Sequence, residues 1–159
     1  MSIETRKEGA DLERFRLVED LFRPADPTQS FAIWHSVCLF AESKPAWKIY
    51  LNPQAQGRGR AAAVVEEALV RLGYPDAWPA LSAIAGRRGP DLDELKYISL
   101  DLAQGRAARL KVYFRHHRAT AAELEQAFSA ARNHVPGDVL EFCDMMVVSE
   151  GPFLAKPVG

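Results

Sequence analysis

The sequence of 159 residues has few cysteines and no long apolar run. Its two cysteines, Cys38 and Cys143, each lie in an apolar stretch without a C-x-x-C partner. This spacing argues against a disulfide framework or a zinc site and predicts two buried free thiols. No run of about 18 apolar residues occurs that could cross a membrane, and the polar N-terminus lacks the apolar region of a signal peptide. These absences predict a cytoplasmic protein.

The sequence also lacks an excess of charge of either sign. Its 20 basic and 21 acidic side chains give a formal net charge of -1, whereas domains that bind nucleic acid usually carry a basic excess along one face. The hydrophobic fraction of 48% is ordinary, and it excludes an intrinsically disordered chain. We therefore expect a globular protein that has no nucleic-acid partner.

Hydrophobic periodicity predicts helices that alternate with pairs of strands. The helices are expected at about residues 10–22, 64–72, 75–85 and 120–131, the last opened by a Thr-x-x-Glu capping box and the second closed by Gly73. The strands are expected at about residues 31–40, 47–51, 95–102 and 108–115. This order predicts an α+β fold of two tandem αββα units, at about 10–73 and 75–134, with the start of a third unit at 139–159.

The two expected hairpins share a Lys-x-Tyr pattern. Lys48 and Tyr50 lie in the first, and Lys111 and Tyr113 in the second, 63 residues later (111 minus 48). Because residues two apart share a face of a strand, these side chains and Arg109 lie on one face, and the apolar residues between them lie on the other. We expect the amphipathic helices to cover the apolar face.

The cations on the polar face allow two interpretations. An antiparallel sheet often has one solvated face on which lysine and arginine are common. Alternatively, Lys48, Arg109 and Lys111 repel one another unless an anion neutralises them, which favours a phosphate or diphosphate ligand held by charge-assisted hydrogen bonds. Tyr50 and Tyr113 would add phenol donors and aromatic faces. The pattern alone leaves both interpretations open.

Four stretches together resemble the aromatic prenyltransferases of the dimethylallyltryptophan-synthase type, in particular their bacterial branch, which fold as an αββα (ABBA) barrel with the helices outside. The stretches are Trp34-His35-Ser36, the segment 48–57 (KIYLNPQAQG), the segment 94–101 (ELKYISLD) and the segment 109–114 (RLKVYF). The family closes its barrel with about five such units, so the two complete units here would be only its central portion.

The resemblance implies a binding site for an allylic diphosphate, usually dimethylallyl diphosphate. By position, Lys48, Arg109 and Lys111 would bind the diphosphate, and Tyr50 and Tyr113 would shield the allylic carbocation. An aromatic acceptor such as tryptophan or another indole would then attack. The family's glutamate base has no counterpart that we identify, so no catalytic residue is predicted.

Three residues of the third expected strand are candidates for the acceptor pocket. Tyr97, Ser99 and Asp101 alternate along it and so share a face. The simpler alternative is that they are polar residues near the end of a strand, and this alternative stays open.

The sequence lacks the aspartate cluster that a magnesium-dependent prenyltransferase needs. Prenyltransferases that bind their donor through magnesium need an aspartate cluster of the DDxxD type, and none occurs here; Asp91-x-Asp93-Glu94 is interpreted as a solvated loop. The sequence therefore predicts a metal-independent enzyme without a cofactor.

His35 is expected to be a hydrogen-bonded core residue, and His116 and His117 are expected at the surface.

The function predicted from the sequence is transfer of a dimethylallyl group to an aromatic acceptor by an incomplete prenyltransferase domain. The rival hypothesis is an inactive remnant or interaction module whose open strand edges pair with a second copy or a complementing chain. An RNA-binding sheet is disfavoured by the balanced charge.

Overall fold

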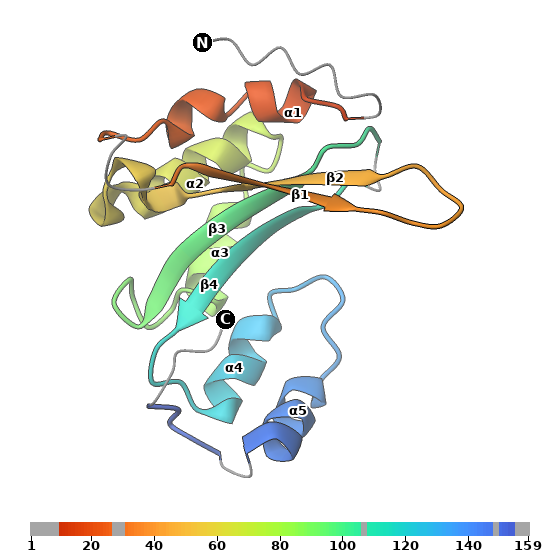
Figure 1. Cartoon of the computed structure of the whole chain (residues 1–159). Coiled ribbons are helices and arrows are strands. Elements are labelled where there is room, and N and C mark those ends of the chain that lie inside the picture. Colours follow the sequence, from red (N-terminus) through yellow and green to blue (C-terminus); the bar gives the residue numbers. More distant parts are fainter. Residues whose placement is uncertain (1–9, 27–30, 106–107, 148–149, 155–159) are drawn as a thin grey trace. The chain divides into compact units, whose positions relative to one another are not determined.

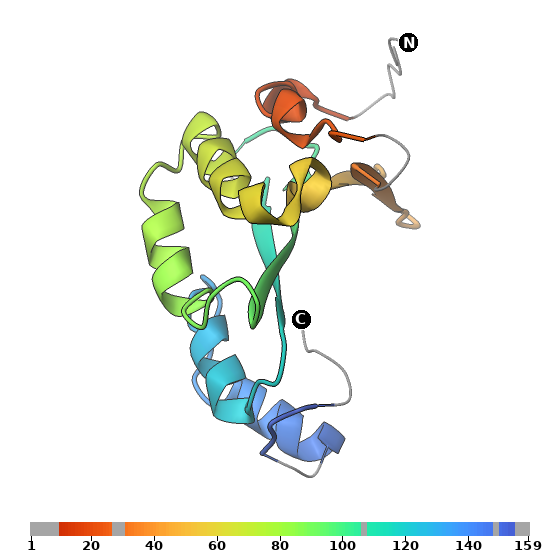
Figure 2. The ribbon, with the colours of Figure 1, turned by 90° about the vertical axis from the view of Figure 1, so that its left-hand side faces the viewer.

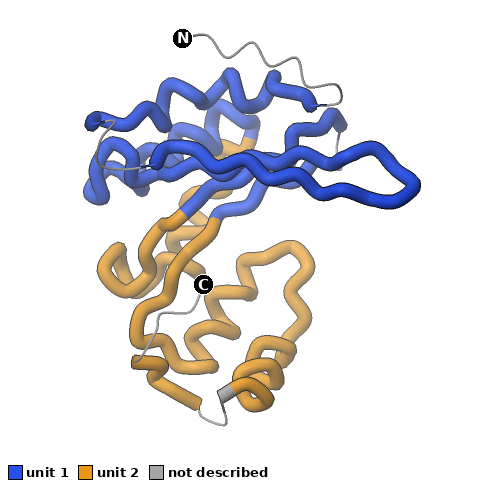
Figure 3. The backbone as a smooth tube through the Cα atoms, viewed as in Figure 1, with its two compact units in different colours: residues 1–73, 97–112 blue, residues 74–96, 113–159 orange. Residues whose placement is uncertain are grey.

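This computed structural model describes residues 10–26, 31–105, 108–147 and 150–154. The chain divides into two compact units, shown in Figure 3. Unit 1 comprises residues 1–73 and 97–112, and unit 2 comprises residues 74–96 and 113–159. Each unit is therefore built from two separate stretches of the sequence.

Four strands form one sheet in the order β1-β2-β3-β4 (Figure 1). The strands are β1 (Ile33–Cys38), β2 (Ala46–Leu51), β3 (Asp93–Asp101) and β4 (Leu110–His116). The pairs β1–β2 and β2–β3 are antiparallel. The predicted α+β class, with two consecutive hairpins in an antiparallel sheet, is confirmed.

The register of unit 1 aligns the polar residues of adjacent strands. Trp34 lies opposite Tyr50 in the β1–β2 pair. In the β2–β3 pair, Lys48 lies opposite Asp101, and Tyr50 lies opposite Ser99. Since directly opposed residues share a face of the sheet, these five side chains belong to one face.

The opposite face of the unit 1 strands forms the core with α2 (Ala61–Arg71). Figure 2 shows α2 along one side of the strands. The helix contributes Val64 and Ala68, and the strands contribute four side chains with at most 1% exposure: Ile49, Leu51, Ile98 and Leu100. This packing confirms that the helix covers the apolar face and leaves the Lys and Tyr face uncovered by it.

The end of α2 follows the sequence prediction. Gly73 has φ of +88°, a left-handed conformation that residues with a Cβ adopt only at a cost, and its N–H donates to the carbonyl of Val70. Two short 3-10 helices precede α2, η2 (Pro53–Gln56) and η3 (Arg58–Arg60).

The first predicted helix, at 10–22, is interrupted. It consists of α1 (Glu13–Arg16) and the 3-10 helix η1 (Glu19–Phe22). Between them, Val18 leaves the α-helical conformation with φ of -128°. Val18 and Phe22 are both buried in the core of unit 1, so tertiary packing rather than helix propensity determines the backbone there.

The described part of unit 2 contains three helices, α3 (Ala77–Ile84), α4 (Ala121–Phe128) and α5 (Asp138–Val147). The predicted capping box is present: the Glu123 N–H donates to the Thr120 hydroxyl, and the Thr120 N–H donates to the Glu123 carboxylate. Leu124 of α4 packs with Cys143 of α5. Assignment of 139–159 to a third unit stays a prediction.

Two predictions for the first strand are wrong. His35 is exposed rather than part of the core, and Cys38 is exposed rather than buried, whereas Cys143 is buried as expected. The reason is the position of β1 at the edge of the sheet, where Ile33 is the strand residue that packs against the core. Both cysteines are free thiols.

In the part of the chain that the structure describes, every helix is too short or too polar to cross a membrane.

We expect the replacement Leu51→Ala to lower the free energy of unfolding by about 2–5 kcal/mol, because it opens a cavity in the core of unit 1. Urea denaturation monitored by circular dichroism measures this change. Val70→Ala is the matched control, since Val70 lies on the exposed side of α2 with 46% exposure. Equal losses for the two variants would contradict this assignment of the core.

Candidate functional site

Lys48, Asp101 and Arg109 form one polar cluster on the uncovered face of unit 1. The Lys48 Nζ lies 3.6 Å from Asp101 Oδ1, and the Arg109 Nε donates to Asp101 Oδ2 at 2.8 Å. The backbone N–H of Arg109 donates to the same Oδ2 at 3.1 Å. The three residues come from β2, the end of β3 and the segment that leads into β4. The sheet therefore brings together Lys48 and Arg109, two of the residues predicted to bind the diphosphate.

The Asp101 carboxylate is held in its ionised form. Burial alone would raise the pKa of Asp101, but the hydrogen bonds from Arg109 and the positive charges of Arg109 and Lys48 outweigh it, and the net effect lowers the pKa. The side chains of Lys48 and Asp101 are each 17% exposed, whereas that of Arg109 is 60% exposed. The Arg109 side chain is therefore accessible to solvent and small anions.

The other two residues of the repeated pattern are in different environments. Lys111 is exposed in β4, two residues after Arg109. Tyr113 is half-buried and belongs to unit 2. Their assignment to the diphosphate and to the carbocation shield stays a prediction.

An aromatic cluster lies on the same face of the unit 1 strands. The ring of Trp34 stacks on that of Phe31 with centroids 4.5 Å apart, and it lies 5.5 Å from the ring of Tyr97. Tyr50 meets Tyr97 edge to face at 6.3 Å. Trp34 and Phe31 are 51% and 38% exposed, so this cluster presents aromatic surface to solvent rather than filling the core. Trp34 and Phe31 are not among the candidates predicted from the sequence, although Trp34 lies in one of the four matching stretches.

The three candidates for the acceptor pocket differ in accessibility. Tyr97 is half-buried within the aromatic cluster, Ser99 is only 2% exposed, and Asp101 is occupied by its two cations. A role for Ser99 in an acceptor pocket stays a prediction.

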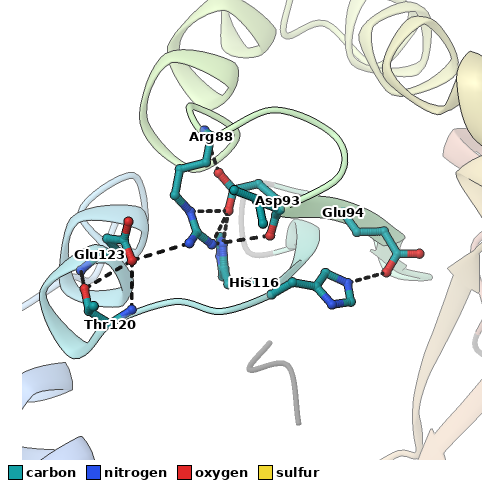
Figure 4. A network of polar contacts seen from close by, with 8 residues as sticks. Arg88, Asp93, Glu94, His116, Thr120 and Glu123 are labelled. Atoms are coloured by element: carbon teal, nitrogen blue, oxygen red, sulfur yellow. Dashed lines mark hydrogen bonds and ion pairs between the residues drawn. The ribbon is translucent and has the colours of Figure 1, made fainter. Parts of the chain in front are cut away.

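A second polar network lies in unit 2 (Figure 4). Asp93 accepts hydrogen bonds from the Arg88 guanidinium at 2.7 Å and from the Arg88 backbone N–H at 2.8 Å, and it contacts the His116 ring at 2.8 Å. An Arg88 guanidinium nitrogen also lies 3.4 Å from a carboxylate oxygen of Glu123, the capping-box partner of Thr120 at the start of α4. The network ties the start of β3, the end of β4 and the start of α4 together.

This network overturns two sequence interpretations. His116 is 5% exposed rather than at the surface, and Asp93 is 4% exposed rather than part of a solvated loop. Asp93 is the first residue of β3 and is paired with Arg88, a partner that the sequence pattern does not indicate. His117, half-buried, contacts the neighbouring carboxylate of Glu94 at 3.1 Å. Among the described residues, no three histidine, cysteine or acidic side chains are grouped so that they could hold a metal ion.

The folds of solved tryptophan prenyltransferases are similar to this one. The 6-dimethylallyltryptophan synthase from Micromonospora olivasterospora, solved with DMASPP and Trp, is 33% identical with a TM-score of 0.83, over 93% of this chain and 42% of that one. PriB, in a binary complex with product diphosphate, is 32% identical with a TM-score of 0.77, over 93% and 40%. The 5-dimethylallyltryptophan synthase from Streptomyces coelicolor, also solved with DMASPP and Trp, is 30% identical with a TM-score of 0.73, over 93% and 40%. No protein-family model matches the sequence.

Together, the antiparallel hairpins, the covering helix and these similarities define an αββα fold of the ABBA type. The chain belongs to the aromatic prenyltransferases of the dimethylallyltryptophan-synthase type, as the sequence predicted. It spans about two fifths of the length of the members that it matches.

The unit 2 network generates a prediction for stability against pH. Burial alone would raise the pKa of Asp93, but the hydrogen bonds from Arg88 and His116 outweigh it, and the net effect lowers the pKa. A lowered folded-state pKa contributes stability that is complete above the unfolded-state value of about 3.9 and is lost as the pH falls through the folded-state value.

We therefore expect Asp93→Asn to lower the free energy of unfolding by about 3 kcal/mol near neutral pH, because it leaves Arg88 without its buried counter-charge. The difference from the wild type should shrink as the pH falls below about 4. Urea denaturation at a series of pH values measures it, and Asp144→Asn, at an exposed position of α5, is the control. A difference that does not change with pH would show that the charge of Asp93 does not stabilise unit 2.

Proposed function

We propose that this chain supplies the donor-binding face of an aromatic prenyltransferase that transfers a dimethylallyl group from dimethylallyl diphosphate to tryptophan or a related indole. The observation that carries the proposal is the convergence of Lys48 and Arg109 on the polar face of the sheet, beside Tyr50, in a chain that matches enzymes solved with a donor analogue and tryptophan. Lys111, two residues after Arg109, would add a third cation.

The chemistry explains why this face suits an allylic donor. Breaking the allylic C–O bond leaves a diphosphate anion and an allylic cation. Fixed Lys and Arg side chains stabilise the anion, and the π face of Tyr50 stabilises the cation while it helps to exclude water. The indole ring then forms the new carbon–carbon bond and loses a proton. Because Lys and Arg charges take the place of a divalent ion at the diphosphate, we propose that the reaction does not need a metal ion.

The aromatic cluster is the better candidate for the acceptor side. Trp34 and Phe31 offer a stacked, solvent-accessible aromatic surface on the same face as the cations. An indole can stack on such a surface in the offset or edge-to-face geometry that aromatic pairs prefer. We propose that Trp34 contacts the acceptor, in place of the buried Ser99.

We expect Lys48→Ala and Lys111→Ala each to weaken binding of the unreactive donor analogue DMASPP by about 10- to 100-fold, because a hydrogen bond to a charged group contributes about 1.5–3 kcal/mol. Isothermal titration calorimetry measures this change, and EDTA should leave the affinity of the wild type unchanged. Lys44→Ala is the control, since Lys44 is exposed in the turn between β1 and β2. Unchanged affinity in both lysine variants would refute the assignment of the site.

We expect Trp34→Ala to weaken binding of L-tryptophan by about 3- to 10-fold, the effect of losing one aromatic pair, and to leave binding of DMASPP unchanged. Calorimetry with each ligand separates the two effects. Phe40→Ala removes an equally exposed ring beyond the end of β1 and should change neither affinity. Equal losses for the two ligands would indicate general damage to the face rather than an acceptor contact.

Activity is tested by incubating the chain with dimethylallyl diphosphate and L-tryptophan and measuring prenylated tryptophan by mass spectrometry. The rival role, an interaction module, draws support from the edge strand β1, where Trp34 and Val37 are exposed together with Leu39 and Phe40 just beyond it. A chain that binds neither ligand and elutes as an oligomer in size-exclusion chromatography would favour that role.

A further inference from the structure

Asp101 forms ion pairs with two of the three cations of the proposed diphosphate site, Lys48 and Arg109. Its Oδ1 faces the Lys48 Nζ at 3.6 Å, and its Oδ2 accepts from the Arg109 Nε at 2.8 Å. Lys48 comes from the strand on one side of β3, and Arg109 comes from the segment that leads into the strand on the other side. One carboxylate therefore links three neighbouring segments of the sheet in unit 1.

We propose that Asp101 is the positioning residue of the diphosphate site, which holds the charged ends of Lys48 and Arg109 at a fixed separation in which both can meet one diphosphate. This inference rests on the proposed function and assigns Asp101 a role different from the acceptor contact predicted from the sequence.

The carboxylate is itself anchored to the backbone. The Arg109 N–H donates to its Oδ2 at 3.1 Å, and the Asp101 N–H donates to the Arg109 carbonyl at 3.0 Å. Asp101 is only 17% exposed, so its side chain has little freedom to turn away. An acceptor fixed in this way orients its donors before the ligand arrives, which reduces the entropy lost on binding.

The bond geometry at Arg109 is compatible with a ligand on the guanidinium. Asp101 accepts from the Nε and from the backbone N–H of Arg109, and the Arg109 side chain as a whole is 60% exposed. An arginine presents five N–H donors in a rigid fork, so orienting Nε also fixes the direction of the two terminal nitrogens.

The competing interpretation is that Asp101 is a resident counter-ion that a diphosphate must displace. The two interpretations predict changes of opposite sign when the charge is removed. If Asp101 competes with the ligand, its neutralisation strengthens anion binding. If it positions the cations, neutralisation weakens anion binding even though the site becomes more positive.

The test uses inorganic pyrophosphate as the probe and calorimetry as the readout. We expect Asp101→Asn to bind pyrophosphate at least about tenfold more weakly than the wild type, as expected when one charge-assisted contact is lost. Asp101→Glu keeps the charge but moves the carboxylate by one methylene, and we expect it also to bind more weakly. Glu94→Gln is the matched control, because Glu94 lies on the same strand and pairs with Lys96 and His117 instead.

Each outcome either supports the inference or overturns it. The positioning role is overturned if either variant, Asp101→Asn or Asp101→Glu, binds pyrophosphate as tightly as the wild type or more tightly. If only Asp101→Asn binds pyrophosphate more tightly, Asp101 is a resident counter-ion. If Asp101→Asn does not fold, as judged by circular dichroism, Asp101→Glu decides. A ligand-independent measurement is the exchange of the Arg109 Nε–H by NMR, which should be slowed in the wild type and fast in Asp101→Asn; equal rates overturn the positioning role. If the wild type binds no pyrophosphate although its Arg109 Nε–H exchanges slowly, the proposed function is contradicted. Asp101 then orients Lys48 and Arg109 without a role in diphosphate binding.

Discussion

The register between β2 and β3 is the constraint on which the candidate site depends. It places Lys48 opposite Asp101 and Tyr50 opposite Ser99 on one face, and Ile49 opposite Leu100 on the other. Because side chains alternate along a strand, a slip of one residue would move the lysine into the core and Ile49 into solvent. The apolar contacts with α2 therefore fix the register, and the register in turn aligns the charged and aromatic residues. The core and the site are two consequences of the same pairing.

Much of this arrangement could be predicted from the sequence because it follows from local rules. Alternation along the strands predicted which side chains face α2, and the Lys-x-Tyr repeat identified the polar face. The capping box at Thr120 and the glycine after α2 fixed helix ends that the structure confirms. Each of these inferences uses residues that are close together in the chain, where backbone geometry leaves few alternatives.

The structure differs from the sequence-based expectations, or adds to them, where burial and pairing depend on contacts made by the whole fold. The Lys-x-Tyr pattern left open whether an external anion neutralises the cations, and it did not indicate that Asp101 pairs with two of them. The sequence predicts solvated positions for His116 and Asp93, because only the fold brings His116 into contact with Asp93, which also pairs with Arg88. The sequence predicts that His35 and Cys38 are buried, because the apolar character of their segment does not reveal that β1 is an edge strand. Position within a sheet is a property of the whole topology, which no single segment encodes.

The same register has a consequence for the order in which the protein folds. The β1–β2 hairpin closes between Cys38 and Ala46, only 8 residues apart (46 minus 38), whereas Lys48 and Asp101 are 53 residues apart (101 minus 48). Closing the longer loop costs more chain entropy and is slower, so the hairpin and α2 can form before β3 arrives. Arg109 is only 8 residues from Asp101 (109 minus 101) and can reach its carboxylate within the β3–β4 hairpin, whereas Lys48 reaches it only when β2 and β3 pair. We expect the contact between Lys48 and Asp101 to form late and to have a small φ-value, so its loss would accelerate unfolding and leave the folding rate nearly unchanged.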